Sequence, residues 1–342
     1  MSFSVGIVGL PNVGKSTLFK SLTKKEVEIA PRPFTTIHPN IGIVSVPDQR
    51  LEKIAKIIKP EKVTPTTIKF VDIAGLVKGA HKGQGLGNQF LAQIRNCDAI
   101  LEVVRCFENP NIENVLGEIN PEKEIEIVKI ELLMKDLETL KNSISKLEKK
   151  KSKQTLKKIE LLRKIEEAVS RSQLVSEVDL TDREKLEIKE YQFLTVKPII
   201  YILNTNRKPK DLEQSSKHLT MNLKLEEEIS ELLESEIKEL GMESHLDGVI
   251  TSCYNTLDLI TFFTITGGKE TRAWTMPKGL NIAKAGGVVH SDFEKKFIKA
   301  EVISWSDLVK VSSWNKAREL GGLKTAGKDY IVQDGDVIEF KI

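Results

Sequence analysis

The residues with the clearest chemical signature lie at positions 9 to 17, which read Gly-Leu-Pro-Asn-Val-Gly-Lys-Ser-Thr. Their types and spacing fit the phosphate-loop pattern G-x-x-x-x-G-K-[ST]. Glycines let main-chain N–H groups turn inward around a polyphosphate, where side chains would block the approach. Lys15 is a flexible positive charge that can reach the β- and γ-phosphates, and the Ser16 hydroxyl can ligate Mg²⁺. The stretch therefore predicts a nucleoside triphosphate site.

The segments on either side of this loop have the patterns that such a site needs. Residues 3–10 form a short apolar run, which is typical of a buried strand in a parallel sheet. Residues 17–22 open a helix, and the dipole at a helix N-terminus favours a bound anion. A chance glycine-rich turn would not carry both neighbours, so we expect a strand, a phosphate loop and a helix in succession.

Downstream residues supply candidate contacts for Mg²⁺ and the γ-phosphate. Thr36 lies in a loop interrupted by prolines at 31, 33 and 39, and we expect it to be a second Mg²⁺ ligand rather than an ordinary loop threonine. A predicted strand at 67–71 runs into Asp72-Ile-Ala-Gly75. An aspartate at the carboxyl end of a parallel strand faces the ligand crevice, so Asp72 is expected to hold Mg²⁺ through water. Gly75 can donate its N–H to the γ-phosphate.

The group that orients the attacking water is less clearly marked. GTPases of the Ras type place a glutamine directly after the glycine of D-x-x-G, but Leu76 occupies that place here. His81 is the titratable side chain nearby with a suitable pKa, and Gln84 is a second candidate. His81 is therefore predicted to be catalytic, the alternative being a solvated loop histidine.

The residues expected to meet the base follow a predicted strand at 197–203 and read Asn204-Thr-Asn-Arg207. GTPases carry N-K-x-D at this place, where the aspartate accepts two hydrogen bonds from guanine. Arg207 has no acceptor, so the strong preference for guanine is lost and ATP is permitted without being proved. Asn204 can still meet the purine edge.

The remaining chain predicts a helical insertion and a separate C-terminal module. Apolar residues at 130, 133, 137, 140, 144 and 147, and again at 159, 162, 165 and 169, form the seam of an antiparallel coiled-coil hairpin. Its lysine-rich tip, 149–158, is either a solvated helix end or a contact for RNA phosphates. Residues 224–240 are expected to form one amphipathic helix. We predict a discontinuous α/β G domain (1–108 and 193–263), a helical insertion (109–192) and a β-rich module (264–342).

Composition narrows the class of protein. The small net charge of +3 argues neither for nor against binding of nucleic acid, so the distribution of charge must decide, and DNA is not an expected partner. Cys97, Cys106 and Cys253 have no metal-binding spacing and form no disulfide framework, which favours a reducing cytoplasm. No apolar run approaches the roughly 18 residues of a membrane span, and the N-terminus leads directly into a predicted strand. We expect a cytoplasmic monomer without a membrane partner.

The chain also resembles the YchF group of the Obg family of P-loop NTPases, the Obg-like ATPases, over nearly its whole length. The resemblance implies a G domain, a coiled-coil insertion and a C-terminal TGS domain of β-grasp type. It further implies Mg²⁺-dependent ATP hydrolysis in preference to GTP, and association with the ribosome or ribosomal RNA. The segments that carry it are 9–17, 33–40, 70–81, 103–107 (Val-Val-Arg-Cys-Phe), 272–275, 293–301 and 327–336.

Site residues follow from the same resemblance. Ser16 and Thr36 would ligate Mg²⁺, Asn204 and Thr205 would meet the base, and His81 would be the catalytic histidine. Asn12 would also help to bind a potassium ion in place of an arginine finger. The residues that would hold the phosphates are Asn12, Val13, Gly14, Lys15, Ser16 and Thr17.

The chain departs from the family pattern at three places. Arg207 replaces the usual glutamate of the base motif, Asn222-Leu-Lys224 replaces S-A-K, and Glu102 replaces a histidine. The first two leave the choice of base open. Our principal hypothesis is a slow ATPase that acts as a ribosome-associated nucleotide switch. The alternatives are a GTPase of the ribosome-assembly type and an RNA-binding adaptor with a structural nucleotide.

Overall fold

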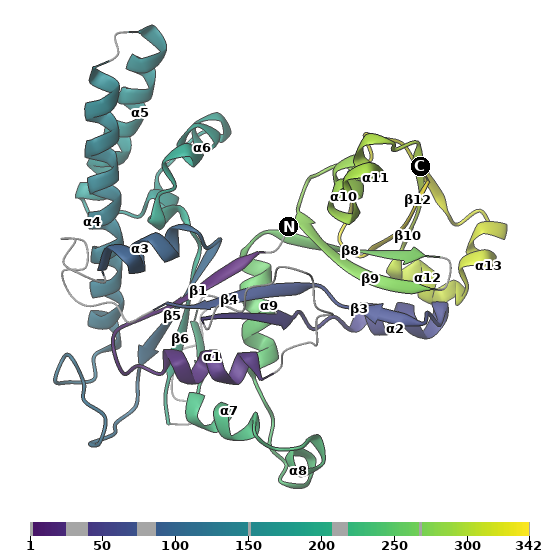
Figure 1. Ribbon diagram of the computed structural model, residues 1–342, viewed down its shortest axis with the longest axis horizontal. Coiled ribbons are helices and arrows are strands. Elements are labelled where there is room, and N and C mark those ends of the chain that lie inside the picture. Colours follow the sequence, from purple (N-terminus) through teal and green to yellow (C-terminus); the bar gives the residue numbers. More distant parts are fainter. Residues whose placement is uncertain are drawn as a thin grey trace. The chain divides into compact units, whose positions relative to one another are not determined.

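The structure, a computed structural model, describes residues 3–24, 40–73, 87–149, 152–206, 218–266 and 269–341. The chain forms two compact units, which Figure 1 shows in ribbon form. The larger unit comprises residues 4–42 and 69–246. The smaller unit comprises residues 1–3, 43–68 and 247–342.

A six-stranded sheet with the order β2-β4-β1-β5-β6-β7 organises the phosphate-loop region. Strand β1 pairs in parallel with β4 and β5, and β6 pairs in parallel with β5 and β7. Every residue of β5 is buried, because its apolar run is covered on both faces of the sheet. The strands are β1 (Ser4–Val8), β2 (Ile41–Ser45), β4 (Thr67–Asp72), β5 (Ala99–Arg105), β6 (Ile199–Asn204) and β7 (His218–Met221).

The larger unit also contains the helices α1 (Lys15–Thr23), α3 (Gly87–Arg95), α7 (Leu223–Ile229) and α8 (Glu234–Glu239). The single helix predicted over 224–240 is wrong, because the chain breaks between α7 and α8. Ser230 turns its hydroxyl back to the carbonyl of Glu227, and the Glu236 carboxylate accepts from the N–H of Leu233 to begin α8. The helical periodicity continues across the break, so the sequence pattern did not reveal it.

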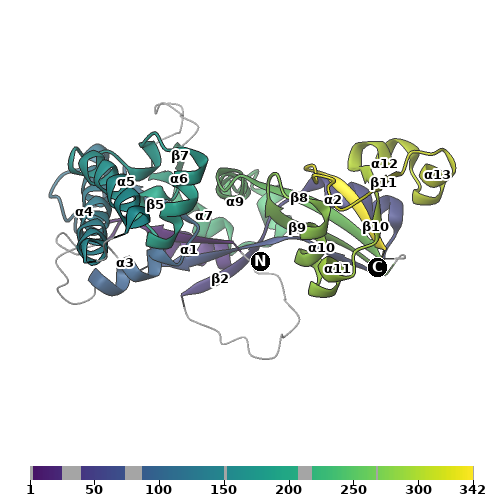
Figure 2. The ribbon, with the colours of Figure 1, turned by 90° about the horizontal axis from the view of Figure 1, so that it is seen from above.

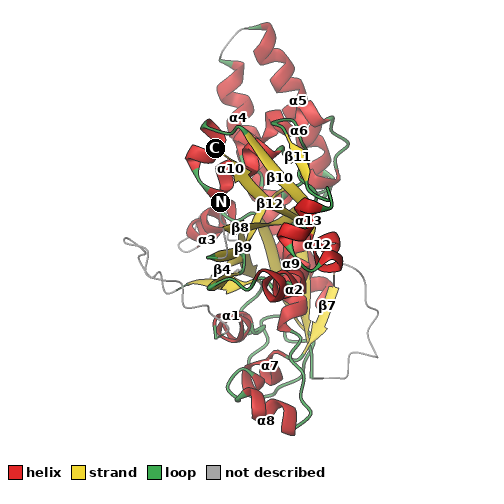
Figure 3. Cartoon of the chain, turned by 90° about the vertical axis from the view of Figure 1, so that its right-hand side faces the viewer, coloured by secondary structure: helices red, strands yellow, loops and turns green. Residues whose placement is uncertain are grey.

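The helical insertion is a long hairpin of α4 (Pro121–Glu148) and α5 (Lys153–Ser170), followed by the short helix α6 (Asp182–Ile188) (Figures 1 and 3). Asn120 and Ser152 cap the two long helices with their side chains, as expected for polar residues at helix starts. The predicted seam is buried or half-buried, except at Ile130, which is 43% exposed, so the prediction was wrong there. The core of the hairpin contains Leu133, Leu140, Ile144, Leu162, Ile165 and Val169.

A buried carboxylate fastens the hairpin to the chain that returns to β6. Asp136 on α4 accepts hydrogen bonds from the N–H of Leu194 and from both the N–H and the hydroxyl of Thr195, at 2.7–2.8 Å. Asp136 and Thr195 are both fully buried. Removing either partner would leave buried polar groups unpaired, so this contact fixes the base of the hairpin.

The smaller unit is built on a second six-stranded sheet, with the order β11-β10-β12-β8-β9-β3. Figure 2 shows α10 and α11 on one face of this sheet and α2 and α12 on the other. Successive residues of β8 point to opposite faces, so Phe262 packs in one core and Phe263 in the other. The strands are β3 (Lys62–Thr64), β8 (Leu259–Thr266), β9 (Glu270–Pro277), β10 (Lys299–Ser304), β11 (Lys324–Ala326) and β12 (Asp336–Lys341). The helices are α2 (Gln49–Ile58), α9 (Leu246–Thr256), α10 (Ile282–Val289), α11 (Ser291–Lys295), α12 (Trp305–Val311) and α13 (Trp314–Glu319).

Residues 43–68 belong to this unit although they lie early in the chain. Strand β3 pairs in parallel with β9, and Leu51 and Ile54 of α2 enter the same core as Phe263. The predicted domain boundaries contained no such grouping, and strand β8 runs across the predicted boundary at residue 264. Those boundaries stay a prediction. No helix in the described part of the chain is both long and apolar enough to cross a membrane.

Candidate nucleotide-binding site

The loop between β1 and α1 has the conformation that a phosphate cradle requires. Gly9, Asn12 and Gly14 have positive φ angles of 144°, 63° and 109°. A Cβ atom at Gly9 would lie 2.4 Å from the carbonyl oxygen of Val103, and one at Gly14 would lie 2.6 Å from the side-chain nitrogen of Asn204. Both positions therefore require glycine, because the loop winds closely against β5 and β6.

Lys15 lies inside this loop. Its side chain is largely buried, and its Nζ donates a 2.7 Å hydrogen bond to the carbonyl of Leu10. Burial lowers the pKa of Lys15 to about 8, while the nearby carboxylates of Asp72 and Glu124 act in the opposite direction. Among the described residues, the carbonyl of Leu10 is the hydrogen-bond partner of this lysine, and a phosphate oxygen can replace it.

Ser16 and Asp72 lie together beside the lysine, and their predicted role in binding Mg²⁺ stays a prediction. The Ser16 hydroxyl donates to the carboxylate of Asp72 over 3.2 Å. Burial raises the pKa of Asp72, whereas the Ser16 hydroxyl and the Lys15 charge lower it. A hydroxyl and one carboxylate suit a hard cation that keeps water and phosphate oxygens as its other ligands. The described residues contain no group of three or more His, Cys, Asp or Glu that could hold a metal by themselves.

Asn204 is committed to the protein itself rather than left facing an open base pocket. Its amide nitrogen donates to the carbonyl of Val13 at 2.9 Å, and its amide oxygen accepts from the N–H of Leu223 at 3.1 Å. The side chain therefore joins the phosphate loop to the start of α7. Thr205 is buried and donates its N–H to the carbonyl of Met221. Contact of either residue with the base stays a prediction.

The other predicted site residues divide into two groups. Val13 is buried in the core, and Thr17 lies in the first turn of α1, where its carbonyl accepts from the Ser21 hydroxyl. Several predicted residues lie outside the described residues, so their predicted roles stay predictions. These are Thr36, Gly75, Leu76, His81, Gln84 and Arg207.

Two buried residues of the site had no role in the sequence-based prediction. Arg105, the last residue of β5, is 3% exposed, and Glu124, in the first turn of α4, is 2% exposed. The N–H of Arg105 donates to the Glu124 carboxylate at 2.9 Å. The motif Val-Val-Arg-Cys-Phe contained the arginine, and its place at the carboxyl end of a parallel strand was the signal that could have identified it.

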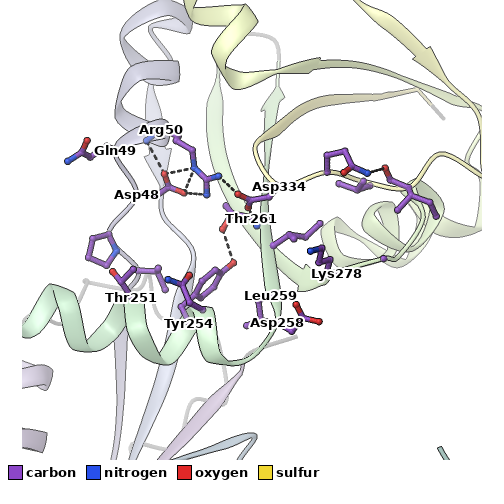
Figure 4. Close-up of a pocket in the computed structure, with 18 residues that line it drawn as sticks. Asp48, Gln49, Arg50, Thr251, Tyr254, Asp258, Leu259, Thr261, Lys278 and Asp334 are labelled. Carbon is purple, nitrogen blue, oxygen red and sulfur yellow. Dashed lines mark hydrogen bonds and ion pairs between the residues drawn. The ribbon is translucent and has the colours of Figure 1, made fainter. Parts of the chain in front are cut away.

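A separate cavity of about 760 Å³ lies within the smaller unit, where α2, α9 and the β8 strand meet (Figure 4). The Arg50 guanidinium bridges the carboxylates of Asp48 and Asp334 there, at 2.7 and 2.5 Å. The buried Tyr254 hydroxyl shares a 2.7 Å hydrogen bond with the Thr261 hydroxyl and donates to the Thr275 hydroxyl at 3.1 Å. The charged groups of Arg50, Asp48 and Asp334 are therefore paired with one another.

Comparison with known proteins gives matches over the full chain. Residues 4–151 match a family described as 50S ribosome-binding GTPase, and residues 259–342 match the C-terminal region of the YchF GTPase, described as a protein of unknown function. The protein named ribosome-binding ATPase YchF of Pasteurella multocida is 45% identical over 361 aligned residues, covering 100% of this chain and 99% of that protein. Its namesake in Bacillus subtilis is 42% identical over 364 residues, with coverage of 100% and 99%.

A solved structure extends these matches to three dimensions. The structure of the Schizosaccharomyces pombe YchF GTPase has a TM-score of 0.87 and 34% identity, and the match covers 99% of this chain and 98% of that one. The predicted fold class is therefore confirmed: an α/β P-loop domain with a helical insertion and a C-terminal β-rich domain. The chain belongs to the YchF family of the Obg-like P-loop GTPases.

Proposed function

We propose that this chain hydrolyses ATP at the phosphate loop and uses the state of the nucleotide to control its association with the ribosome. The observation that carries the catalytic part is the arrangement of Lys15, Ser16 and Asp72 around a loop whose glycines have positive φ angles. The full-length relatives named ribosome-binding ATPase support the choice of nucleotide and partner.

In this proposal the residues of the chain divide the work of phosphoryl transfer. Lys15 exchanges its bond to the carbonyl of Leu10 for bonds to phosphate oxygens, and its charge stabilises the transition state. The oxygens of Ser16 and Thr36, with Asp72 acting through water, hold Mg²⁺, which when bound neutralises charge on the phosphates. Gly75 donates its N–H to the γ-phosphate, and His81 positions the attacking water.

Asn12 contributes its amide to the same phosphate cradle and would also contact a bound potassium ion. Asn204 and Thr205 adjoin the base in this proposal. Asn204 supports the loop at the same time, because both arms of its amide are bonded to the chain. A variant of Lys15 tests the site as a whole: Lys15→Ala should abolish nucleotide binding or turnover, and wild-type turnover in that variant would refute the proposal.

The choice between ATP and GTP needs a direct test, because the names of the relatives differ. The bacterial relatives are named ATPases, whereas the yeast structure is titled a GTPase. We propose ATP, since Arg207 offers no acceptor to the N–H groups of guanine. Competition of unlabelled ATP and GTP against a labelled ATP analogue decides the question, and tighter binding of GTP would favour the GTPase alternative.

Ribosome association would place the chain in the cytoplasm. Co-sedimentation with ribosomes, in the presence of ADP or a non-hydrolysable ATP analogue, should give different bound fractions for the two nucleotides. Contact between the lysines of 149–158 and RNA phosphates would make binding fall steeply with salt. Steady-state phosphate release at the background rate would instead favour an adaptor in which the nucleotide is only structural.

A further inference from the structure

Arg105 forms an unusual buried hub next to the phosphate loop. Its guanidinium donates to four main-chain carbonyls of the segment 107–113, at 3.0–3.3 Å. It also stacks over the ring of Phe107, with 4.5 Å from its central carbon to the ring centroid. An arginine can satisfy so many acceptors at once because its five N–H donors are held in a rigid plane. The carbonyls belong to Phe107, Asn109, Ile112 and Glu113.

One of these carbonyls connects the hub directly to the phosphate loop. The carbonyl oxygen of Glu113 accepts from Arg105 Nη1 at 3.0 Å and from the side-chain Nδ2 of Asn12 at 3.3 Å. Asn12 is the residue of the phosphate loop with φ of 63°, a left-handed conformation that asparagine adopts more readily than most residues with a side chain. The bond to Glu113 stabilises this conformation, and it leaves the oxygen of the Asn12 amide as the atom available to a ligand.

The main chain of Arg105 is anchored as well. Its N–H donates to the buried Glu124 carboxylate on α4, and the residue after it, Cys106, donates its N–H to the carbonyl of Asn204. The hub is therefore fixed on two sides by elements that adjoin the site. Because the guanidinium bonds four carbonyls of the loop 107–113, the path of that loop depends on it.

From this geometry we propose that Arg105 is a positioning residue for nucleotide binding, which acts through the carbonyl of Glu113 to hold the side chain of Asn12 in the phosphate loop. The inference rests on the proposed function, because it needs a nucleotide at the loop. Arg105 touches no ligand in this account. Its effect on affinity exists only while Asn12 can donate to Glu113.

A double-mutant cycle tests this dependence. The variants are Arg105→Lys, Asn12→Ala and the double variant, and the probes are ADP and a non-hydrolysable ATP analogue, titrated by calorimetry. Lysine keeps the charge of residue 105 but cannot bond four carbonyls at once. Each single variant should weaken binding about three- to tenfold, the size of one hydrogen bond, and the double variant should be no weaker than the weaker single variant. Arg171→Lys is the matched control, because the Arg171 side chain is 75% exposed on the insertion. The affinity of this variant for both probes should equal that of the wild type.

Unfolding in urea separates this role from a structural one. Arg105→Lys should lower the free energy of unfolding equally in the wild-type and the Asn12→Ala backgrounds, while its effect on affinity disappears in the second. Additive losses of affinity, or unchanged affinity in Arg105→Lys, would overturn the inference and leave the proposed function intact. Failure of the wild-type chain to bind either probe would refute the proposed function itself.

A second measurement does not require the Arg105 variant to fold. Amide hydrogen exchange in residues 107–113 of the wild-type chain should slow at least about threefold when the ATP analogue binds, because the bond between Asn12 and Glu113 is then held more often. The same slowing should be absent in Asn12→Ala. Exchange that the analogue leaves unchanged in the wild type would overturn the inference.

Discussion

Asn204→Ala is the substitution whose outcome the structure defines best. The side chain is 7% exposed and holds two groups that have no other partner in the hydrogen bonds described, the carbonyl of Val13 and the N–H of Leu223. Leaving a buried donor or acceptor unpaired costs about 1–3 kcal/mol, so two of them cost about 2–6 kcal/mol before any water enters. We therefore expect a fall of about 3 kcal/mol in the free energy of unfolding, measured in urea. Asn142→Ala, an exposed asparagine on α4, serves as the control and should change it by less than about 0.5 kcal/mol.

Binding measurements on the same variant separate support of the loop from contact with the base. A loop that loses its bond from Asn204 should bind inorganic triphosphate more weakly, by about the same factor as ATP. A factor of ten in affinity corresponds to about 1.4 kcal/mol, so a loss of that size is easily measured. Unchanged triphosphate affinity together with weaker ATP binding would refute our account of Asn204 as a support of the loop and would favour contact with the base alone.

Three further outcomes follow from other residues. Lys15→Met should weaken ATP-analogue binding about a hundredfold in calorimetry without unfolding the protein, and binding within a factor of three of wild type would count against the site. Glu102 is buried, and both burial and the Glu124 charge raise the pKa of its carboxyl well above the usual value; the folded state thus keeps a proton that the unfolded chain loses. Its contribution to stability should fall as pH rises above the unfolded pKa of about 4.3. The free energy of unfolding of Glu102→Gln, relative to that of the wild type and measured in urea, should therefore be higher at pH 8 than at pH 4. A difference between variant and wild type that does not change with pH would contradict this. Leu162→Ala should cost about 2–5 kcal/mol in urea unfolding, and the 65%-exposed Leu156→Ala on the same helix should cost little; equal losses would show that the hairpin seam is misassigned.

The features that were predictable from the sequence are those with local physical requirements. The phosphate loop needs glycine at two positions of positive φ and a lysine and a hydroxyl beside them, and all of these are neighbours in the chain. The hairpin seam repeats over many turns, so its periodicity was visible even though Ile130, its first predicted residue, is exposed. In both cases a pattern within a short window determines the structure.

The features that were missed depend on contacts between distant residues. Strand β3 has only three residues, its Val63 is 44% exposed, and its pairing partner on β9 lies more than two hundred positions away, so no alternation of apolar residues marked it. Arg105 bonds main-chain carbonyls, which every residue type carries, so its role left no pattern in the neighbouring side chains. The amide of Asn204 was expected at the base, but its nitrogen donates to the carbonyl of Val13, a residue 191 positions away in the chain.

The path of residues 43–68 gives the molecule a mechanical property. This stretch lies in the chain between Thr36 and Asp72, the two residues expected to respond to the γ-phosphate. Within the smaller unit, this stretch is anchored by the pairing of β3 with β9 and by a 2.5 Å hydrogen bond between the hydroxyls of Thr66 and Thr275. If Thr36 and Asp72 bind Mg²⁺ as the sequence predicts, we expect their displacement after hydrolysis to pull on this anchor along the polypeptide. The smaller unit would then respond to loss of the γ-phosphate through the polypeptide that connects it to the site.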